Sequence, residues 1–265
     1  MSGRQGPVTE MHAPVELADI AADMLARLRA RAPRVHCITN TVAQQYTANV
    51  LLAVGAVPSM TISPEEIVSF VANADALLVN LGTFDAERRA AIDLAIGAAS
   101  AARKPWVLDP VFIDRAPARA QFARELLGRT PAVVRLNATE FGALSGGDPA
   151  GDAAARFAKT HATVVALTGG VDRVTDGVRC AVIPNGDPLM GVVTAMGCAC
   201  SALVCAALAV ETDAWLAATA AVTVLGVAGE VAALDARGPG SFAGAIIDAL
   251  HGLDAATLRA RTRVS

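Results

Sequence analysis

The chain has 265 residues, a formal net charge of −3 at pH 7 and a pI near 5.8, with 18% charged and 54% hydrophobic residues. This charge balance provides no basic patch of the kind that nucleic acid requires, so a nucleic-acid partner is disfavoured. The length allows one large α/β domain or two small ones. We predict the simpler arrangement, a single domain over residues 1–265 with a polar tail at residues 1–14.

The first segment after the tail, Val15 to Arg31, has apolar residues at helical spacing and must end before Pro33. Short apolar runs that predict buried strands then alternate with helical segments. The predicted strands are Arg34–Thr39, Ala56–Met60, Ala76–Asn80, Trp106–Asp109, Ala132–Leu136 and Thr163–Thr168. The predicted helices are Ala43–Val54, Asp85–Arg103, Ala118–Leu127, Thr139–Leu144, Ala153–Lys159, Ala214–Leu234 and Ser241–Leu250. Repeated strand–helix units predict a mostly parallel sheet covered by helices on both faces.

Two local signals predict where elements begin and turn. Ser63, Pro64 and Glu66 have the spacing of a helix cap, a first-turn proline and a capping-box glutamate. Asp176-Gly177, between two β-type runs, is typical of a hairpin and predicts an antiparallel pair at the sheet edge.

The stretch from Gly191 to Val210 predicts an extended segment that enters a helix through a tight turn at residues 195–198. The start of such a helix presents free backbone N–H groups and the positive end of the helix dipole, which suit a phosphate. Cys198 falls in the first turn, where a thiol is biased toward thiolate.

Three alternative interpretations of this region remain. The charge-free run from Pro188 to Val210 is long enough to span a membrane, but its many Ala, Gly, Cys, Ser and Thr residues argue against that. The helix is also suited to packing in a core. A metal shared by its three cysteines is disfavoured, because helical geometry separates Cys198, Cys200 and Cys205.

The five cysteines of the chain are odd in number and do not resemble the framework of a disulfide-rich secreted protein. The first residues contain no apolar stretch of the signal-peptide type. We therefore expect a cytoplasmic protein with no membrane partner. The scarcity of charge also predicts contacts buried between subunits.

Polar residues follow several predicted strands, and the carboxyl ends of parallel strands meet at one edge of a sheet. The residues at or just beyond these ends include Asn40, Asn80, Asp109, Glu140 and Thr168. Asp109 and Glu140 are a plausible pair of carboxylates for Mg²⁺, which keeps much of its water. From the residues alone, Asp109 could equally form only a turn, Asn40 only a helix cap and Thr168 only a turn. Neither a P-loop nor a dinucleotide fingerprint is present.

Seven collinear segments give the sequence a more specific resemblance. They are VHCITNTVAQQYTANVLLAVGAVPSM, ALLVNLGT, WVLDPV, VVRLNATE, ALTGGVDRVTDG, GCACSAL and GPGSF. In these segments the chain resembles the hydroxyethylthiazole kinase family, which serves thiamine salvage and belongs to the ribokinase-like superfamily. The resemblance implies a three-layer α/β/α fold and an ATP- and Mg²⁺-dependent phosphorylation of the primary alcohol of 4-methyl-5-(2-hydroxyethyl)thiazole.

The resemblance also implies roles for individual residues. Arg135 and Thr168 would contact ATP, and Asp109 and Glu140 would hold the metal. The remaining roles are substrate binding by Asn40, Met60 and Ala195, an anion hole at Ala195, Met196 and Gly197, and catalysis by Cys198, which stands where most ribokinase-like enzymes carry an aspartate base. The family resemblance further implies a homotrimer with sites at subunit interfaces.

Two segments depart from the family pattern. The family reads Gly-Thr-Gly-Cys at the anion hole, where this chain has Ala195 and Met196 before Gly197. An alanine there would be strained if the turn needs a positive φ. Phe112 to Asp114 replaces a glycine-rich turn. The alternative functions are therefore a related kinase for another heterocyclic alcohol and a non-catalytic nucleotide-binding protein.

Overall fold

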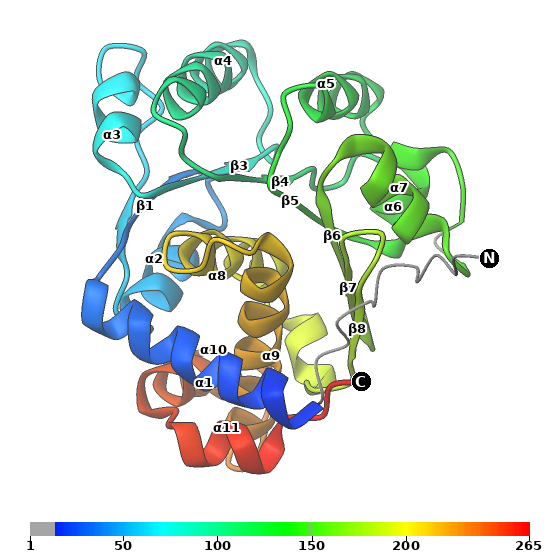
Figure 1. The fold of residues 1–265 in the computed structure, drawn as a ribbon. Helices are drawn as coiled ribbons and strands as arrows, with labels where there is room; N and C mark the ends of the chain where they lie inside the picture. The colour runs from blue at the N-terminus through cyan, green and yellow to red at the C-terminus, as the bar shows by residue number, and fades with distance from the viewer. Residues whose placement is uncertain (1–13, 149) are drawn as a thin grey trace, which may run out of the picture.

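The computed structural model describes residues 14–148 and 150–265, in which one eight-stranded sheet lies between two layers of helices (Figure 1). The strand order is β2-β1-β3-β4-β5-β6-β7-β8. The first six strands of this order are parallel, and β7 and β8 pair antiparallel at the edge. The strands are β1 Arg34–Ile38, β2 Val57–Ser59, β3 Ala76–Asn80, β4 Trp106–Asp109, β5 Val133–Asn137, β6 Val164–Thr168, β7 Asp172–Thr175 and β8 Cys180–Ile183.

Helices cover both faces of the sheet, as Figure 1 shows. One face carries α3 Ile67–Asn73, α4 Ala86–Ala101, α5 Pro117–Leu127, α6 Ala138–Ser145 and α7 Ala153–His161. The other carries α1 Pro14–Arg31, α2 Gln44–Ala53, α8 Met196–Leu208, α9 Ala214–Ala233, α10 Pro239–Gly252 and α11 Ala255–Arg261. Successive strand residues alternate between two hydrophobic cores, so that Leu77 packs on one face and Leu78 on the other. The predicted three-layer α/β/α arrangement is therefore confirmed.

The two turn signals have different outcomes. The hairpin at Asp176-Gly177 joins β7 to β8 at the sheet edge, as predicted. The predicted capping box is wrong, because α3 begins only at Ile67. Residues 63–66 form a turn in which the backbone N–H of Ile67 donates to the carbonyl oxygen of Ser63. In a capping box the Glu66 carboxylate would accept from the backbone N–H of Ser63. Here it accepts instead from the Thr61 hydroxyl at 2.9 Å.

The stretch leading into α8 is only partly as predicted. A 3-10 helix, η1 Pro188–Val192, replaces the first part of the expected extended segment, and Val193 after it is extended. Pro188 favours helical φ at the first position, and the Asp187 carboxylate accepts from the backbone N–H of Leu189 at 2.8 Å. The tight turn and the helix that follows are confirmed, with α8 beginning at Met196.

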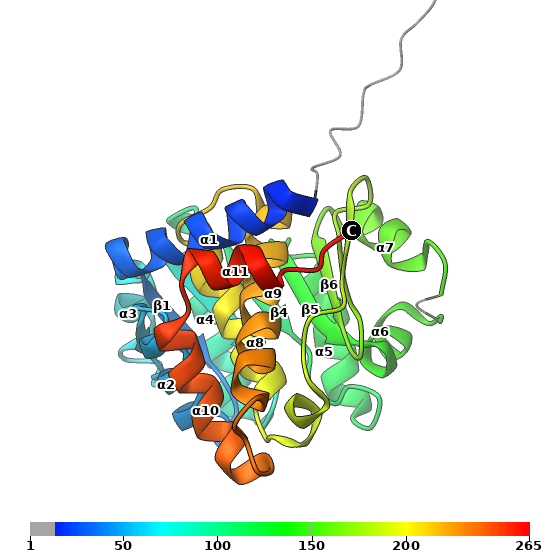
Figure 2. The same cartoon turned by 90° about the horizontal axis from the view of Figure 1, so that it is seen from below.

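One of the described helices, α9, is long and apolar enough to cross a membrane by length and composition. However, 78% of its apolar window is buried inside the protein, where α1, α8 and α10 contact it (Figure 2). It is therefore a core helix of this fold. The predicted polar tail at residues 1–14 lies outside the described residues, apart from Pro14.

Candidate active site

The carboxyl ends of the parallel strands meet at one edge of the sheet. Asn80 at the end of β3 is paired in register with Asp109 at the end of β4, and Asn137 of β5 with Thr168 of β6. The N-terminus of α8 reaches the same edge, because the Cys198 sulfur lies within hydrogen-bond distance of the Asn80 amide. The topology thus brings together polar side chains that are far apart in the sequence.

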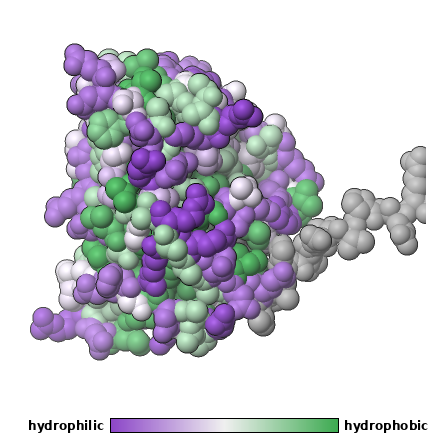
Figure 3. Space-filling model, turned by 60° about the vertical axis from the view of Figure 1, so that its left-hand side comes forward, coloured by the Kyte–Doolittle hydropathy of each residue, from purple (hydrophilic) through white to green (hydrophobic). Residues whose placement is uncertain are grey.

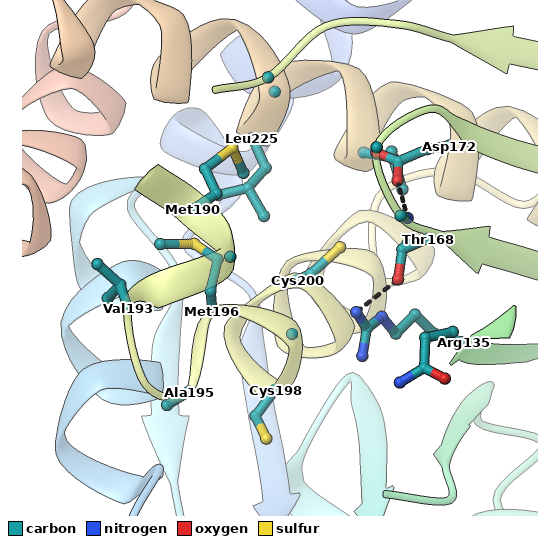
Figure 4. A pocket seen from close by; sticks show the side chains of 18 of the residues that line it. Arg135, Thr168, Asp172, Met190, Val193, Ala195, Met196, Cys198, Cys200 and Leu225 are labelled. Atoms are coloured by element: carbon teal, nitrogen blue, oxygen red, sulfur yellow. Dashed lines mark hydrogen bonds between the residues drawn. The ribbon is translucent and has the colours of Figure 1, made fainter. Parts of the chain in front are cut away.

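A cavity of about 740 Å³ opens beside these strand ends. Its lining includes Arg135, Glu140, Thr168, Ala195, Met196, Gly197 and Cys198 from the set expected from the sequence. Figure 4 shows Arg135 hydrogen-bonded to Thr168 on one side of this cavity and Met190 beside Leu225 on another. Asp109, Asn40 and Met60 do not line it. Asn40 nevertheless reaches the site by donating to the Cys198 sulfur, whereas Met60 is half-buried against the core on the α2 side of the sheet.

The first turn of α8 leaves backbone donors free. Ala195 precedes the helix with φ 71° and makes no side-chain cap. Within the described residues, the N–H groups of Gly197 and Cys198 have no hydrogen-bond partner. The left-handed conformation costs an alanine about 1–2 kcal/mol. The strain expected from the alanine at this position is therefore present, and the donors suit an anion.

Arg135 adds a positive charge to the same place. Its Nη2 donates to the Thr168 hydroxyl at 2.5 Å, and its Nη1 lies 4.0 Å from Oδ1 of Asp109. A Cβ atom added to Gly197 would lie 2.6 Å from Nη1 of Arg135, so only glycine allows the guanidinium to pack this closely on α8. The guanidinium and the free N–H groups together make the cavity attractive to phosphate.

Asp109 is fully buried and uses its two carboxylate oxygens differently. Oδ2 accepts from Asn80 Nδ2 at 2.7 Å and from the Ser201 hydroxyl at 2.8 Å. Oδ1 has no hydrogen-bond partner among the described residues. Burial raises the pKa of Asp109 to about 6, while the nearby Arg135 charge acts to lower it. A buried, unpaired carboxylate oxygen is a position suited to a cation or a bound water.

Glu140 is the second buried carboxylate. Its Oε1 accepts from the backbone N–H of Phe112 at 2.9 Å, and its Oε2 accepts from the backbone N–H of Asn137 at 2.9 Å. The Asn137 side chain in turn accepts from the backbone N–H of Glu140, which completes a capping box on α6. Because carboxylate oxygens can accept more than one contact, these bonds hold Glu140 in place and leave acceptor capacity toward the cavity.

Asp109 and Glu140 suit Mg²⁺ better than a metal ion whose ligands all come from the protein. Within the parts of the chain that the structure describes, no three His, Cys, Asp or Glu side chains are grouped to hold a metal. Magnesium needs only one or two carboxylates, because water and substrate phosphates supply its other ligands. The free Oδ1 of Asp109 and the fixed Glu140 carboxylate meet that requirement.

Cys198 is half-buried, and its sulfur accepts hydrogen bonds from Asn40 Nδ2 and Asn80 Nδ2 at 3.3 Å each. Burial raises the pKa of the Cys198 thiol to about 11, and the Asp109 charge acts in the same direction. The expected bias toward thiolate is therefore wrong, because burial outweighs the helix terminus and the two amide donors.

The loop after β4 is also strained. Val111 has φ 26° and Phe112 has φ 54°, conformations that non-glycine residues rarely adopt. The Arg119 guanidinium donates to the Val111 carbonyl oxygen at 2.7 Å and holds the loop. Phe112 is 61% exposed at the mouth of the cavity, so the bulk that replaces a glycine-rich turn faces outward.

Three side chains of the site have no role assigned from the sequence. Asn80 stands at a strand end, but its contacts with Asp109 and Cys198 depend on the strand register. Ser201 lies three residues after Cys198, on the same face of α8. Asp172 lines the cavity and accepts from the backbone N–H of Gly169 at 2.8 Å, and burial raises the pKa of Asp172 to about 6. In the sequence, the two glycines after Thr168 indicate a turn that brings Asp172 back toward the end of β6.

Comparison with known proteins shows which family the chain resembles. The model of the hydroxyethylthiazole kinase family matches residues 25–256. A probable hydroxyethylthiazole kinase from Agrobacterium fabrum is 48% identical over 231 residues, which cover 87% of this chain and 88% of that protein. The structure of hydroxyethylthiazole kinase from Pyrococcus horikoshii OT3 has a TM-score of 0.89 and 37% identity, over 92% of this chain and 98% of that one.

A more distant neighbour has the same fold. The ribokinase-like superfamily protein from Enterococcus faecalis V583 has a TM-score of 0.65 at 13% identity, over 86% of this chain and 93% of that one. At this identity the likeness concerns the fold alone. The family match and the two closer relatives cover most of the chain, and this chain therefore belongs to the hydroxyethylthiazole kinase family.

Proposed function

We infer that the protein transfers the terminal phosphoryl group of ATP to the primary alcohol of 4-methyl-5-(2-hydroxyethyl)thiazole, an enzymatic step of thiamine salvage. The observation that carries this inference is the anion site, where Arg135 and the free N–H groups of Gly197 and Cys198 face one cavity beside Asp109. Relatives with 44% identity or more carry the name of this enzyme.

We propose that Arg135 and Thr168 bind the nucleotide phosphates, while the turn formed by Ala195, Met196 and Gly197 shapes the anion hole. In the described part of the chain, the N–H groups of Gly197 and Cys198 are its free donors, whereas the N–H of Met196 already donates to the Val193 carbonyl oxygen at 3.4 Å. Asp109 and Glu140 would hold Mg²⁺ through one or two direct contacts and water. When bound, the ion would neutralise charge that develops on the phosphates. Arg135 supplies a fixed charge of the same sign, and its position against Gly197 keeps it aimed at the anion hole.

We propose that Cys198 lies next to the acceptor hydroxyl and that its thiolate form accepts the hydroxyl proton late in the reaction, as the oxygen bonds to the terminal phosphorus and the bond to ADP breaks. Because burial raises the pKa of this thiol to about 11, only a small fraction is thiolate at neutral pH, and the protonated thiol cannot take a second proton. Phosphoryl transfer has a loose transition state that needs little early proton removal, so a base that is ionised in only a small fraction of molecules suffices. General-base help is worth about 10²–10⁴-fold, and positioning with electrostatics supplies the rest.

We further propose a cytoplasmic homotrimer with sites at the subunit interfaces. Apolar side chains reach the surface around the β2 edge of the sheet, and Figure 3 shows hydrophobic and hydrophilic side chains interspersed on this side. They are Val42, Leu52, Val57, Val68 and Phe70. Met60 follows β2 and lies outside the cavity of its own chain, which suits a role at the site of a neighbouring copy. There it would complete a thiazole pocket to which the neighbour contributes Asn40 and Ala195.

A phosphotransfer assay with MgATP and a panel of heterocyclic alcohols tests the function. We expect turnover of the thiazole alcohol and release of one ADP for each alcohol phosphorylated. Turnover of a different alcohol alone would reassign the substrate, and nucleotide binding without transfer to any alcohol would contradict catalysis. Sedimentation analysis at several protein concentrations tests the trimer separately.

A further inference from the structure

The carboxamide of Asn80 lies between the two reactive groups of the site. Asn80 ends β3 and is 1% exposed. Its Nδ2 donates to Oδ2 of Asp109 at 2.7 Å and to the sulfur of Cys198 at 3.3 Å. Its Oδ1 accepts from Asn40 Nδ2 at 3.2 Å and from the backbone N–H of Gly82 at 3.0 Å. One side chain therefore contacts both the buried carboxylate and the thiol.

The partners determine which way this amide points. The Gly82 N–H can only donate, so the atom facing it must be the oxygen. An ionised Asp109 carboxylate can only accept, so the atom facing it must be the nitrogen. The two requirements agree, and a flipped amide would lose both bonds. The orientation that aims a donor at the Cys198 sulfur is therefore fixed by two partners other than the cysteine.

The surrounding residues hold this arrangement rigid. Both hydrogens and both acceptor positions of the Asn80 amide are used, as the four contacts show. Asn40 is locked as well, since its Oδ1 accepts from the backbone N–H of Ala43 at 3.0 Å. A Cβ atom at Gly82 would lie 2.6 Å from Cβ of Asn40, so this glycine leaves room for the second amide.

The network assigns a distinct task to each oxygen of Asp109. Asn80 and Ser201 both donate to Oδ2, which leaves the buried Oδ1 without a partner in the described part of the chain. Oδ1 is also the atom nearest Arg135, at 4.0 Å from Nη1. Without the Asn80 donor, rotation of the carboxylate would no longer be opposed from the β3 side.

We propose that Asn80 is a positioning residue that holds the Asp109 carboxylate and the Cys198 thiol in one fixed relation. The proposal rests on the proposed function, in which Asp109 serves the metal and Cys198 faces the alcohol. Asn80 itself does not line the cavity and touches neither substrate in this account. Its contribution acts through its two partners, and so it should depend on their presence.

A double-mutant cycle tests this dependence. We expect Asn80→Ala to lower kcat by about 100-fold while the KM for MgATP changes by less than about threefold, because the nucleotide contacts are elsewhere. In the Cys198→Ala background the same change should cost less than about tenfold, since coupled residues are not additive. Equal losses in both backgrounds, or a loss confined to KM, would overturn the proposal.

A second Asn80 variant and a control variant separate loss of the hydrogen bonds from a general effect of mutation. Asn80→Asp has nearly the same shape but presents an acceptor to Asp109 and Cys198, so we expect a loss at least as large as with alanine. Asn73→Ala removes an exposed asparagine on α3 whose amide donates to the Ser69 carbonyl oxygen, and it should leave kcat unchanged. Thermal unfolding of each variant shows whether it is folded. A fully active Asn80→Asp variant would also overturn the proposal.

A spectroscopic readout works without turnover. The S–H stretching band of Cys198 is isolated as the infrared difference between the wild type and Cys198→Ser at neutral pH, where the thiol is protonated. We expect this band to shift in Asn80→Ala and Asn80→Asp, because the sulfur loses one of its two amide donors. An unshifted band would overturn the proposal. A band that shifts in both variants, together with a wild type that phosphorylates no thiazole alcohol, would instead reject the proposed function.

Discussion

Replacing Gly197 with alanine tests how Arg135 is held against α8. The added Cβ atom would lie 2.6 Å from Nη1, 2.8 Å from Nη2 and 3.0 Å from Cζ of Arg135. The guanidinium must retreat by roughly 1 Å to reach an ordinary contact of about 3.5 Å. Its 2.5 Å hydrogen bond to Thr168 would then exceed the length of a good bond. A hydrogen bond from this charged donor to a nucleotide phosphate contributes about 1.5–3 kcal/mol, so moving the guanidinium away from the anion site should cost about 10–150-fold in affinity.

Isothermal titration with MgATP measures this effect directly. We expect Gly197→Ala to weaken nucleotide binding within that range while the protein stays folded. Alanine favours the helix over glycine by about 1 kcal/mol, which offsets part of the lost hydrogen bond to Thr168. Gly97→Ala is the matched control, since Gly97 also lies inside a helix and a Cβ there would meet nothing within 4 Å. Unchanged affinity in Gly197→Ala would refute the close packing of Arg135 as a source of nucleotide binding.

Three other changes have defined outcomes. Ala195→Gly should raise the thermal midpoint by a few degrees, about 1 kcal/mol, because glycine relieves the φ of 71°; a lower midpoint would contradict this strain. Cys198→Ser should lose much of kcat with nearly unchanged nucleotide affinity, and full turnover would remove Cys198 from the mechanism. Burial lowers the pKa of His36, which bridges the Ser59 hydroxyl and the Thr61 carbonyl oxygen, so the folded state disfavours its charged form. Stability should therefore fall as pH drops below about 6.5, and His36→Gln should reduce that fall in pH-dependent unfolding; an identical pH dependence would contradict it.

The fold follows from the sequence because its signals are local. Apolar runs such as Ala76–Asn80 alternate with amphipathic helices, and Asp176-Gly177 is itself a sufficient hairpin signal. Local signals also explain the failures. The capping box predicted at Ser63 does not form, because the Glu66 carboxylate accepts from the Thr61 hydroxyl. The segment before Val193 is a 3-10 helix, because Pro188 and the Asp187 cap favour helical turns there.

The site is less predictable, because its chemistry depends on contacts between distant segments. Asn80 is recognisable as a strand end, but its bonds to Asp109 and Cys198 follow from strand register and from the approach of α8. The helix terminus alone suggests a thiolate at Cys198, whereas burial raises the pKa of that thiol to about 11. Burial is a property of the packed molecule, and the sequence around Gly197 does not reveal it.

The central claim is that the first turn of α8, together with Arg135, binds the terminal phosphate of ATP beside the acceptor alcohol. A crystal structure with Mg²⁺, a non-hydrolysable ATP analogue and the thiazole alcohol tests it most directly. We expect the terminal phosphate within hydrogen-bond distance of the Gly197 and Cys198 N–H groups, with the alcohol oxygen next to the Cys198 sulfur. A terminal phosphate bound away from this turn, with the N–H groups facing only water, would contradict the account.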